Sequence, residues 1–312
     1  MSEALLEVDG LVKQFGSLKA VDEVGFQVRS GEICGFIGPN GAGKTTTMRI
    51  ISTLEMPDRG DVRVAGYSAL AEARDVRQCL GFMPDSFGAY PSTTVLEYLD
   101  FFARAYQLRG EARRNALSSV VEFTHLGELL GKPVGGLSKG MRQRLCLAKT
   151  LLHDPQVLIL DEPASGLDPR ARVELRELVK ALAELGKAVL ISSHILTELA
   201  EICTSVVVIE RGKLQASGSL DEIEGGIARR REVFARTLQP DIELQRFLSE
   251  QPFVESLRLE KGGAAFEFTG SEEQRAQLLA GLLTAGLQPV EFGTREVDLE
   301  DIFMQLTEGR VQ

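Results

Sequence analysis

Residues 38–45 read GPNGAGKT and fit the pattern GxxxxGK[ST] at every fixed position. The segment follows the apolar run Ile33–Ile37, a predicted strand, and precedes a predicted helix over residues 46–54, which is the context that this pattern requires. Glycines let backbone N–H groups turn inward around a polyphosphate, because a side chain there would block its approach. The helix adds unpaired amides and the positive end of its dipole. The segment therefore predicts a phosphate-binding loop between a strand and a helix.

Two side chains of this loop predict further chemistry. Lys44 can neutralise the outer phosphates of the ligand, and the Thr45 hydroxyl can bind magnesium. The residues of the loop and of the helix start that we expect to contact the ligand are Gly38, Pro39, Asn40, Gly41, Ala42, Gly43, Lys44, Thr45 and Thr46.

A pair of acids follows the apolar run Val157–Leu160, which continues as Asp161-Glu162-Pro163. Open parallel sheets place their ligands at the carboxyl ends of the strands. Asp161 is positioned to hold magnesium, directly or through water, and Glu162 could take a proton from an attacking water. Alone, such a pair is a weak signal, because acids often begin the next helix. Together with the phosphate-binding loop, it predicts an active site.

Short apolar runs alternate with helical patterns from the start of the chain to about residue 220, which is an α/β pattern. The clearest predicted strands are brief and apolar on both faces, as in a covered parallel sheet: Ile33–Ile37, Val157–Leu160, 188–191 and 206–209. Residues 172–185 predict a helix with an apolar side made of Val173, Leu175, Leu178, Val179 and Leu182. Residues 87–153 contain no convincing strand and predict a mostly helical insertion. We expect one domain over residues 1–222 and a second over 223–312.

A polar stretch at 217–226 and a short basic run at 229–231 precede the second domain. We interpret the basic run as a solvated linker or helix end; the alternative is a contact with anionic lipid or a partner. Strands are predicted at 232–238, 253–259, 264–268 and 288–292, and helices at Asp241–Ser249, Glu272–Thr284 and 299–306. The middle two strands form a hairpin around Lys261-Gly262-Gly263. The order βαββαβ predicts a small α+β domain of the split-βαβ, ferredoxin-like kind.

Composition limits the class of protein. The 312 residues contain 35 Lys and Arg against 45 Asp and Glu, a formal net charge of −10, which argues against broad electrostatic capture of nucleic acid. No stretch approaches the roughly 20 apolar residues needed to span a bilayer, and the start MSEALLEVDG does not resemble a signal peptide. The four cysteines are far apart and no histidine clusters with them, so no zinc site is expected and the thiols should be reduced. We expect a cytoplasmic chain that reaches a membrane only through another protein.

Several further segments occur in an order that resembles one family. Residues 137–141, LSKGM, start a predicted helix before the carboxylate strand, and residues 165–168, SGLD, follow the acid pair. His194 follows the predicted strand 188–191, and Phe15 precedes the phosphate-binding loop. Over residues 4–220 the chain resembles the ATP-binding subunit of an ABC transporter. The resemblance implies a P-loop NTPase core of the ABC ATPase type with a helical subdomain.

The resemblance also implies a mechanism that needs a homodimer. In the family, two subunits face each other head to tail, so ATP on one phosphate loop is closed by the signature segment of the other, here residues 137–141. Ser138 and Gly140 would offer a hydroxyl and an amide to the γ-phosphate. His194 would contact the γ-phosphate, Phe15 would stack on adenine, and Asp168 of the D-loop would contact the nucleotide. Without the family context, His194 would be interpreted as a helix-capping or surface residue and Phe15 as a core or turn residue.

The implied cofactors are ATP and Mg²⁺, with Glu162 and His194 as the catalytic residues and Thr45 and Asp161 on the metal. Asp85 stands where the family usually has Gln, which contacts the metal and its water. A carboxylate can accept such contacts, but when ionised it cannot donate a hydrogen bond. We predict that Asp85 is a metal-side ligand; the alternative is an inert loop acid.

The signature segment departs from the family sequence LSGGQ at Lys139 and Met141. Lys139 either adds positive charge near the partner's nucleotide or points to solvent. Because Ser138 and Gly140 are both present, we expect hydrolysis to survive these changes.

The tail LEDIFMQLT, at residues 299–307, resembles the carboxy-terminal extension of ATPase subunits that serve two-component exporters of the ABC-2 class. It is also a plain amphipathic helix pattern. The resemblance implies a separate membrane permease as partner. We expect the permease to dock near residues 85–98, where Phe87, Tyr90 and Tyr98 offer aromatic anchors; the alternative is that these aromatics belong to the core.

Two other functions fit parts of the sequence. A soluble ABC ATPase acting on nucleic acid or ribosomes usually carries long coiled-coil inserts, zinc modules or two ATPase units, and the sequence has no sign of these. A phosphotransferase built on the same loop would not need residues 137–141 or 165–168. The sequence therefore favours an ATP-hydrolysing subunit that powers a separate permease, for export, at the cytoplasmic face of a membrane.

Overall fold

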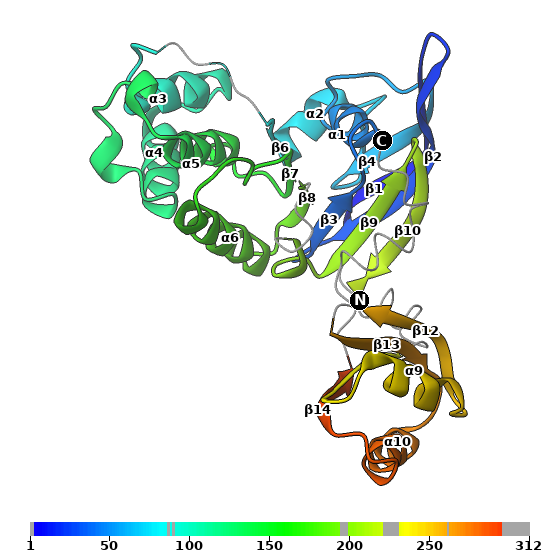
Figure 1. The fold of residues 1–312 in the computed structure, drawn as a ribbon. Helices are drawn as coiled ribbons and strands as arrows, with labels where there is room; N and C mark the ends of the chain where they lie inside the picture. Colours follow the sequence, from blue (N-terminus) through cyan, green and yellow to red (C-terminus); the bar gives the residue numbers. More distant parts are fainter. Residues whose placement is uncertain are drawn as a thin grey trace. The chain divides into compact units, whose positions relative to one another are not determined.

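In the computed structural model, which describes residues 3–85, 88, 91–193, 199–220, 231–260 and 262–294, the main sheet has six strands in the order β10-β9-β3-β8-β7-β6 (Figure 1). They are β3 (Ile33–Ile37), β6 (Leu80–Met83), β7 (Val157–Leu160), β8 (Ala188–Ser192), β9 (Ser205–Glu210) and β10 (Lys213–Ser219). Neighbours are parallel except β9 and β10. β3, β7 and β8 are buried along their whole length, which explains their nearly continuous apolar sequences. The strands predicted from such runs are confirmed.

A second, antiparallel sheet has the order β2-β1-β4-β5 and consists of β1 (Ala4–Phe15), β2 (Leu18–Arg29), β4 (Arg59–Val64) and β5 (Tyr67–Ser68). The expectation that strands and helices alternate from the start of the chain is wrong here, because β1 and β2 form a hairpin with no helix between them. Phe15 pairs with Leu18 across a tight turn in which Gly16 has a φ of 59°, a conformation that suits glycine. Leu6 and Val8 of β1 share one core with the main sheet.

The helices around these sheets follow the sequence patterns, with three corrections, the first being that α1 (Lys44–Ile51) starts and ends before the predicted bounds of 46 and 54. α1 and α2 (Ala73–Cys79) both contribute buried residues to the shared core. α6 (Pro169–Glu184) begins earlier than predicted, because Asp168 caps it by accepting a hydrogen bond of 3.0 Å from the Ala171 backbone N–H. Val173 was expected on the buried side but is 46% exposed. It lies about 160° around the helix from Leu175 at 100° per residue, so it faces away from the core.

The insertion predicted over residues 87–153 is helical where the structure describes it. It contains α3 (Val95–Ala105), α4 (Gly110–Phe123) and α5 (Lys139–Leu151), with short 3-10 turns η1 (Gly127–Leu129) and η2 (Val134–Gly136). Figure 1 shows α3, α4 and α5 grouped together to one side of the sheets. Tyr98 is 5% exposed and its ring lies 4.9 Å from that of Phe102, so its interpretation as a docking anchor is wrong and it belongs to the core. Phe87 and Tyr90 lie outside the described residues.

After Leu220 the chain enters a second compact unit, described over residues 231–260 and 262–294. Its elements are β11 (Arg231–Thr237), α9 (Asp241–Ser249), β12 (Val254–Glu260), β13 (Gly263–Phe268), α10 (Glu272–Thr284) and β14 (Pro289–Thr294). The strands form an antiparallel sheet in the order β12-β13-β11-β14, which confirms the predicted ferredoxin-like class. Phe266, Leu244 and Leu282 join its core. The helix predicted over residues 299–306 lies outside the described residues.

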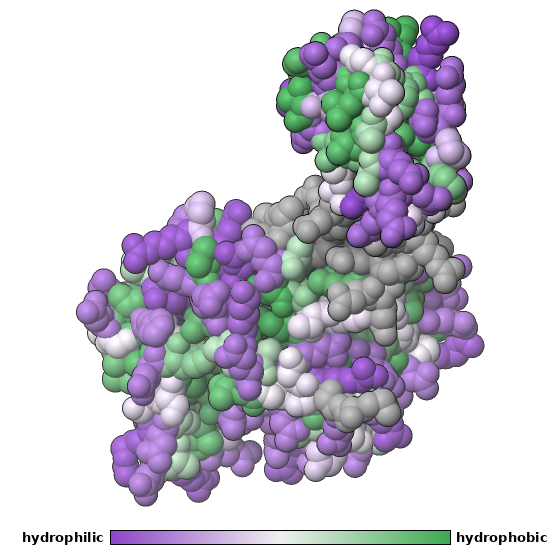
Figure 2. All heavy atoms as spheres, turned by 90° about the horizontal axis from the view of Figure 1, so that it is seen from below, coloured by the Kyte–Doolittle hydropathy of each residue, from purple (hydrophilic) through white to green (hydrophobic). Residues whose placement is uncertain are grey.

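Within the described ranges, no helix combines the length and the apolar character that crossing a membrane demands. Hydrophilic and hydrophobic residues are interspersed on the face seen in Figure 2. The cysteines are free thiols, as expected, and burial raises the pKa of Cys34 to about 12 and that of Cys146 to about 11. These two thiols are therefore protonated at neutral pH.

Candidate functional site

The phosphate-binding loop joins the end of β3 to the start of α1, as its sequence predicts. Gly43 has a φ of 105°, and a Cβ built on it would lie 2.4 Å from the Ala20 carbonyl oxygen. A Cβ on Gly38 would lie 2.4 Å from the Ile209 carbonyl oxygen. Glycine is therefore required at both positions by the packing of the chain itself, in addition to any approach of a phosphate. The sequence could not show this constraint, because Ala20 and Ile209 belong to β2 and β9, far from the loop along the chain.

Lys44 is held inside this loop. Its side chain is largely buried, and its Nζ donates hydrogen bonds to the carbonyl oxygens of Gly38, at 2.5 Å, and Pro39, at 3.3 Å. Burial lowers the pKa of Lys44, while the nearby charges of Glu162 and Asp161 raise it. Within the described chain, this ammonium donates its hydrogen bonds to neutral backbone carbonyls. Its positive charge is therefore available to attract an anion in the loop.

Asp161 lies at the end of β7 and is 5% exposed. Among the effects on the pKa of its carboxyl group, burial is the largest, and it raises the pKa. Hydrogen bonds from Ser192 and Thr45 oppose this rise, and the negative charges of Glu162 and Asp85 add to it. Thr45 and Asp161 are thus adjacent, as predicted, although they come from different parts of the sequence. A cation between them would favour the ionised carboxylate.

Glu162 is attached to the same strand end in an uncommon backbone conformation. Its φ is 50°, in the left-handed region. Its backbone N–H donates a hydrogen bond of 2.9 Å to Ser192 Oγ, and Ser192 Oγ donates one of 2.7 Å to Asp161 Oδ1. Ser192, at the end of β8, was missed by the sequence analysis because it lies in no recognisable motif.

A cavity of about 560 Å³ brings most of the predicted site residues together. The predicted residues that line it are Phe15, Pro39, Asn40, Gly41, Gly43, Lys44, Thr45, Thr46, Asp85, Asp161 and Glu162. Gly38 and Ala42 are buried and do not line it. Leu18, Ala20 and Ser165 also line it and were not predicted. The cavity therefore joins the end of the antiparallel hairpin to the phosphate-binding loop and the acid pair.

The outer part of this cavity is apolar. Phe15 is 48% exposed and Leu18 is 66% exposed, and they face each other across the hairpin turn. Lys13 Nζ lies 5.2 Å from the centre of the Phe15 ring, which orients the ring by a cation–π contact. An exposed aromatic ring beside a phosphate-binding loop can stack on a flat heterocycle, as the resemblance implies for Phe15.

The donor set suits a hard divalent cation. Thr45, Asp161 and Asp85 offer oxygen atoms around one side of the cavity, the ligand type that Mg²⁺ prefers. No group of three or more His, Cys, Asp and Glu side chains that could hold a metal occurs in the described part of the chain. Mg²⁺ keeps several waters and is usually bound by one or two carboxylates together with substrate phosphates, so Thr45, Asp161 and Asp85 are enough to hold it.

The signature segment lies elsewhere in the same chain. Ser138 caps α5 by accepting a hydrogen bond of 3.3 Å from the Met141 backbone N–H. Ser138, Gly140 and Asp168 line a smaller cavity of about 160 Å³ between the starts of α5 and α6. None of the three lines the cavity of the phosphate-binding loop. The predicted site residues therefore form two groups in one copy of the chain, and His194 lies outside the described residues.

Lys139 is exposed and does not line the large cavity. A Cβ on Gly166 would lie 2.5 Å from Lys139 Nζ, so the ammonium lies directly against this glycine. Gly166 has a φ of 64° and belongs to the segment that corresponds to the D-loop. Lys139 therefore connects the signature segment to residues 165–168 of the same chain.

Comparisons with known proteins agree with this geometry. Residues 21–165 match the family described as "ABC transporter". A "Nod factor export ATP-binding protein I" of Burkholderia pseudomallei (strain 1710b) is 36% identical over 311 residues, which cover 98% of both chains. Its namesake in Ralstonia nicotianae is 32% identical over 314 residues, which cover 98% of this chain and 94% of the relative. The solved "Structure of ATP binding subunit of ABC transporter" has a TM-score of 0.66 and 32% identity, covering 72% of this chain and 93% of its own. The chain therefore belongs to the ABC transporter ATP-binding proteins, ATPases that work with a separate membrane permease.

Proposed function

We propose that this chain is the ATP-hydrolysing subunit of an exporter and that two copies bind Mg-ATP between them, head to tail. The separation of two groups of residues within one chain carries this proposal. Lys44, Asp161 and Glu162 line the large cavity, whereas Ser138 and Asp168 line the small one. A second copy that faces the first would bring its own Ser138 to the phosphate-binding loop. Each complete site would then take residues from both copies.

The residues of the large cavity divide the chemistry of hydrolysis among them. Lys44 counters the charge of the outer phosphates, and Phe15 stacks on the adenine ring at the cavity mouth. Thr45, Asp161 and Asp85 hold Mg²⁺, which when bound would neutralise charge that develops on the phosphates. Glu162 accepts a proton from the attacking water.

The remaining residues close the site from two directions. Ser138 and Gly140 of the second copy offer a hydroxyl and a backbone amide at the start of α5 to the γ-phosphate. His194 of the first copy contacts the same phosphate, and Asp168 of the second copy contacts the nucleotide. Lys139 lies against Gly166, so the signature segment and residues 165–168, which the second copy would supply, touch each other.

Export and membrane attachment complete the proposal. Both named relatives are export ATP-binding proteins, which supports export as the direction of transport. The permease would be a separate chain that holds the dimer at the cytoplasmic face of the membrane. Leu96 and Phe101 on α3 are 45% and 65% exposed. Leu96 lies within the segment 85–98 and Phe101 follows it, and these apolar side chains provide anchors for the permease in place of the buried Tyr98.

Replacing Glu162 by Gln tests the reaction and the dimer together. Gln keeps the size of the side chain but cannot act as a base, so turnover should fall by about 100-fold or more, while ATP binding persists. A nucleotide-bound dimer should then accumulate. Phosphate release measures turnover, and light scattering during gel filtration with Mg-ATP measures the mass. Glu184→Gln, at an exposed position near the end of α6, is the matched control. Parental turnover in Glu162→Gln contradicts the assigned base, and a monomer mass with Mg-ATP contradicts the dimer.

A further inference from the structure

The hydroxyl of Ser192 bridges the two acids that follow β7. Ser192 Oγ donates a hydrogen bond of 2.7 Å to Asp161 Oδ1 and accepts one of 2.9 Å from the Glu162 backbone N–H. We propose that Ser192 is a positioning residue for ATP hydrolysis. Its hydroxyl orients the Asp161 carboxylate toward the cation, and it fixes the Glu162 backbone so that the Glu162 carboxylate can accept the proton. This inference rests on the proposed function and adds to it a residue outside the phosphate-binding loop, the acid pair and the signature segment.

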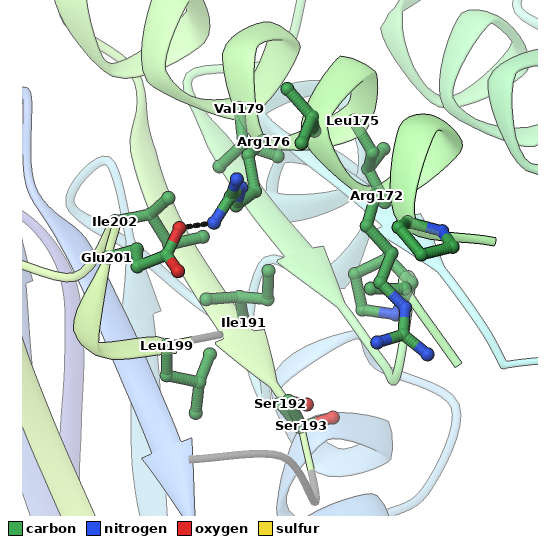
Figure 3. Close-up of a pocket in the computed structure, with 14 residues that line it drawn as sticks. Arg172, Leu175, Arg176, Val179, Ile191, Ser192, Ser193, Leu199, Glu201 and Ile202 are labelled. Carbon is green, nitrogen blue, oxygen red and sulfur yellow. Dashed lines mark ion pairs between the residues drawn. The ribbon is translucent and has the colours of Figure 1, made fainter. Parts of the chain in front are cut away.

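The position of Ser192 follows from the pairing of two parallel strands. Leu160 of β7 pairs with Ile191 of β8, so Asp161, the residue after β7, lies beside Ser192, the last residue of β8. Figure 3 shows Ser192 at the end of β8, beside a hollow of about 300 Å³ that α6 covers. Ser192 is 0% exposed. Removing its hydroxyl would therefore leave buried polar groups of both acids without this partner.

The hydrogen bond to Glu162 holds an uncommon backbone conformation in place. A φ of 50° is rare for a residue with a side chain and persists only where the surroundings impose it. The Glu162 N–H is held by Ser192, and its carbonyl oxygen accepts a hydrogen bond of 3.1 Å from the Ser165 N–H. Because the backbone angles set the direction of the Cα–Cβ bond, Ser192 helps to decide where the Glu162 carboxylate points.

The hydrogen bond to Asp161 restrains the second carboxylate. Asp161 is buried and also accepts a hydrogen bond from the Thr45 hydroxyl. Two hydroxyl donors on one carboxylate limit its rotation and select which oxygen atoms remain for a cation. Partners of this kind, which hold a metal-binding group without touching the metal, typically change metal affinity or activity by about 10- to 100-fold when they are removed.

The other possible role for Ser192 is structural only. In that case the hydroxyl would satisfy buried groups and contribute to stability, and its loss would lower Tm without changing turnover per folded molecule. A change in kcat and in the response to Mg²⁺, with a nearly constant KM for ATP, separates positioning from stability.

Ser192→Ala, Ser192→Cys and Ser192→Thr test the proposal in the full-length chain. Ala removes both hydrogen bonds, Cys keeps the volume but hydrogen-bonds weakly, and Thr keeps the hydroxyl. Ser192→Ala should lower kcat by about 10- to 100-fold, raise the Mg²⁺ concentration needed for half-maximal turnover, and leave KM for ATP within about twofold. Ser192→Thr should restore the parental values. Ser205→Ala is the matched control, because Ser205 is a buried serine at the start of β9 in the same sheet, where its hydroxyl bonds to Glu32.

A second readout does not depend on turnover. The Tm of each variant is measured with ATP in EDTA and with ATP in Mg²⁺. Ser192→Ala should lose most of the additional shift that Mg²⁺ gives the parental chain and keep the shift that ATP gives alone. If Ser192→Ala does not fold, Ser192→Cys carries the same expectations.

Two results overturn the inference. One is a kcat and Mg²⁺ response of Ser192→Ala or Ser192→Cys within twofold of the parental values. The other is equal impairment of Ser192→Thr, which would point to packing rather than to the hydroxyl. The failure of the proposed function looks different: the parental chain would show no Mg-ATP turnover, and Glu162→Gln would not trap a dimer.

Discussion

Asp85 is the residue at which the chain departs most from the family within the large cavity. It is exposed, lines the cavity of the phosphate-binding loop, and lies close enough to Asp161 for its negative charge to raise the pKa of that carboxyl. An inert loop acid would not need this position. Two neighbouring carboxylates repel each other, and a cation between them removes this repulsion. The position of Asp85 therefore favours a metal-side role.

Asp85→Ala should therefore weaken the response to Mg²⁺. We expect the Mg²⁺ concentration for half-maximal ATPase activity to rise several-fold, because one oxygen ligand and one negative charge are lost. A Mg²⁺ titration of steady-state phosphate release measures this. Asp9→Ala, which removes an exposed acid from β1, should have no effect. Unchanged Mg²⁺ dependence and turnover in Asp85→Ala would leave Asp85 as a loop acid without a role.

Residue identities predicted the parts of the site that are contiguous in sequence. The loop at residues 38–45 and the pair Asp161-Glu162 could be assigned because each motif carries its own chemistry over a few neighbouring positions. Ser192 and Leu18 could not, because strand pairing alone brings Ser192 to the acid pair and Leu18 to the cavity. The contact of Lys139 with Gly166 likewise depends on how α5 and α6 meet.

At the scale of elements, the sequence predicts most reliably where local signals mark both ends. α10 begins as predicted because Ser271 and Gln274 form a capping box, and buried strands such as β7 are short apolar runs between polar residues. The hairpin of β1 and β2 was not predicted because its register shifts interrupt the strict alternation that identifies a strand. Long strands with bulges therefore need the structure to define them.

His153 connects the end of α5 to β6. Its Nε2 lies 3.0 Å from the Leu80 carbonyl oxygen, and its ring stacks on Tyr106 at 4.0 Å. Nδ1 is buried without a hydrogen-bond partner among the described residues. Burial lowers the pKa of His153, Lys187 adds to this effect, and the Leu80 carbonyl and Asp154 oppose it. Protonation would thus place a buried N–H group with no acceptor between these elements.

The first unit should lose stability as His153 is protonated. Its folded pKa lies below the unfolded value of about 6.5, so the unfolded state binds more protons in this range and the unfolding free energy falls as pH drops below about 6.5. His153→Gln keeps a donor for Leu80 but does not titrate. Urea unfolding at pH 7.5 and 5.5 should show a smaller loss for this variant than for the parent. His125→Gln, at an exposed position, should behave as the parent. Equal losses for parent and His153→Gln would show that His153 does not contribute.

At the scale of the whole molecule, the described residues of the two units belong to separate hydrophobic cores. One joins both sheets of the first unit, and the other lies between the sheet and the helices of the second unit. Every described residue of the two cavities that form the proposed nucleotide site belongs to the first unit. Nucleotide binding should therefore stabilise the first unit alone, unless the two units unfold together.

Leu282→Ala and Mg-ATP separate these possibilities. Leu282 is 0% exposed on α10, so its truncation should destabilise the second unit by about 2–5 kcal/mol. In Glu162→Gln, where nucleotide persists, Mg-ATP at about 100 times its Kd should stabilise the first unit by about 2.7 kcal/mol. Calorimetry should then show two transitions: Leu282→Ala lowers one Tm and Mg-ATP raises the other. Leu99→Ala, a buried position on α3, should lower the Tm that Mg-ATP raises. A single transition that moves with all three changes would mean that the two units unfold together. Nucleotide binding would then also stabilise the second unit, although that unit contributes no residue to the site.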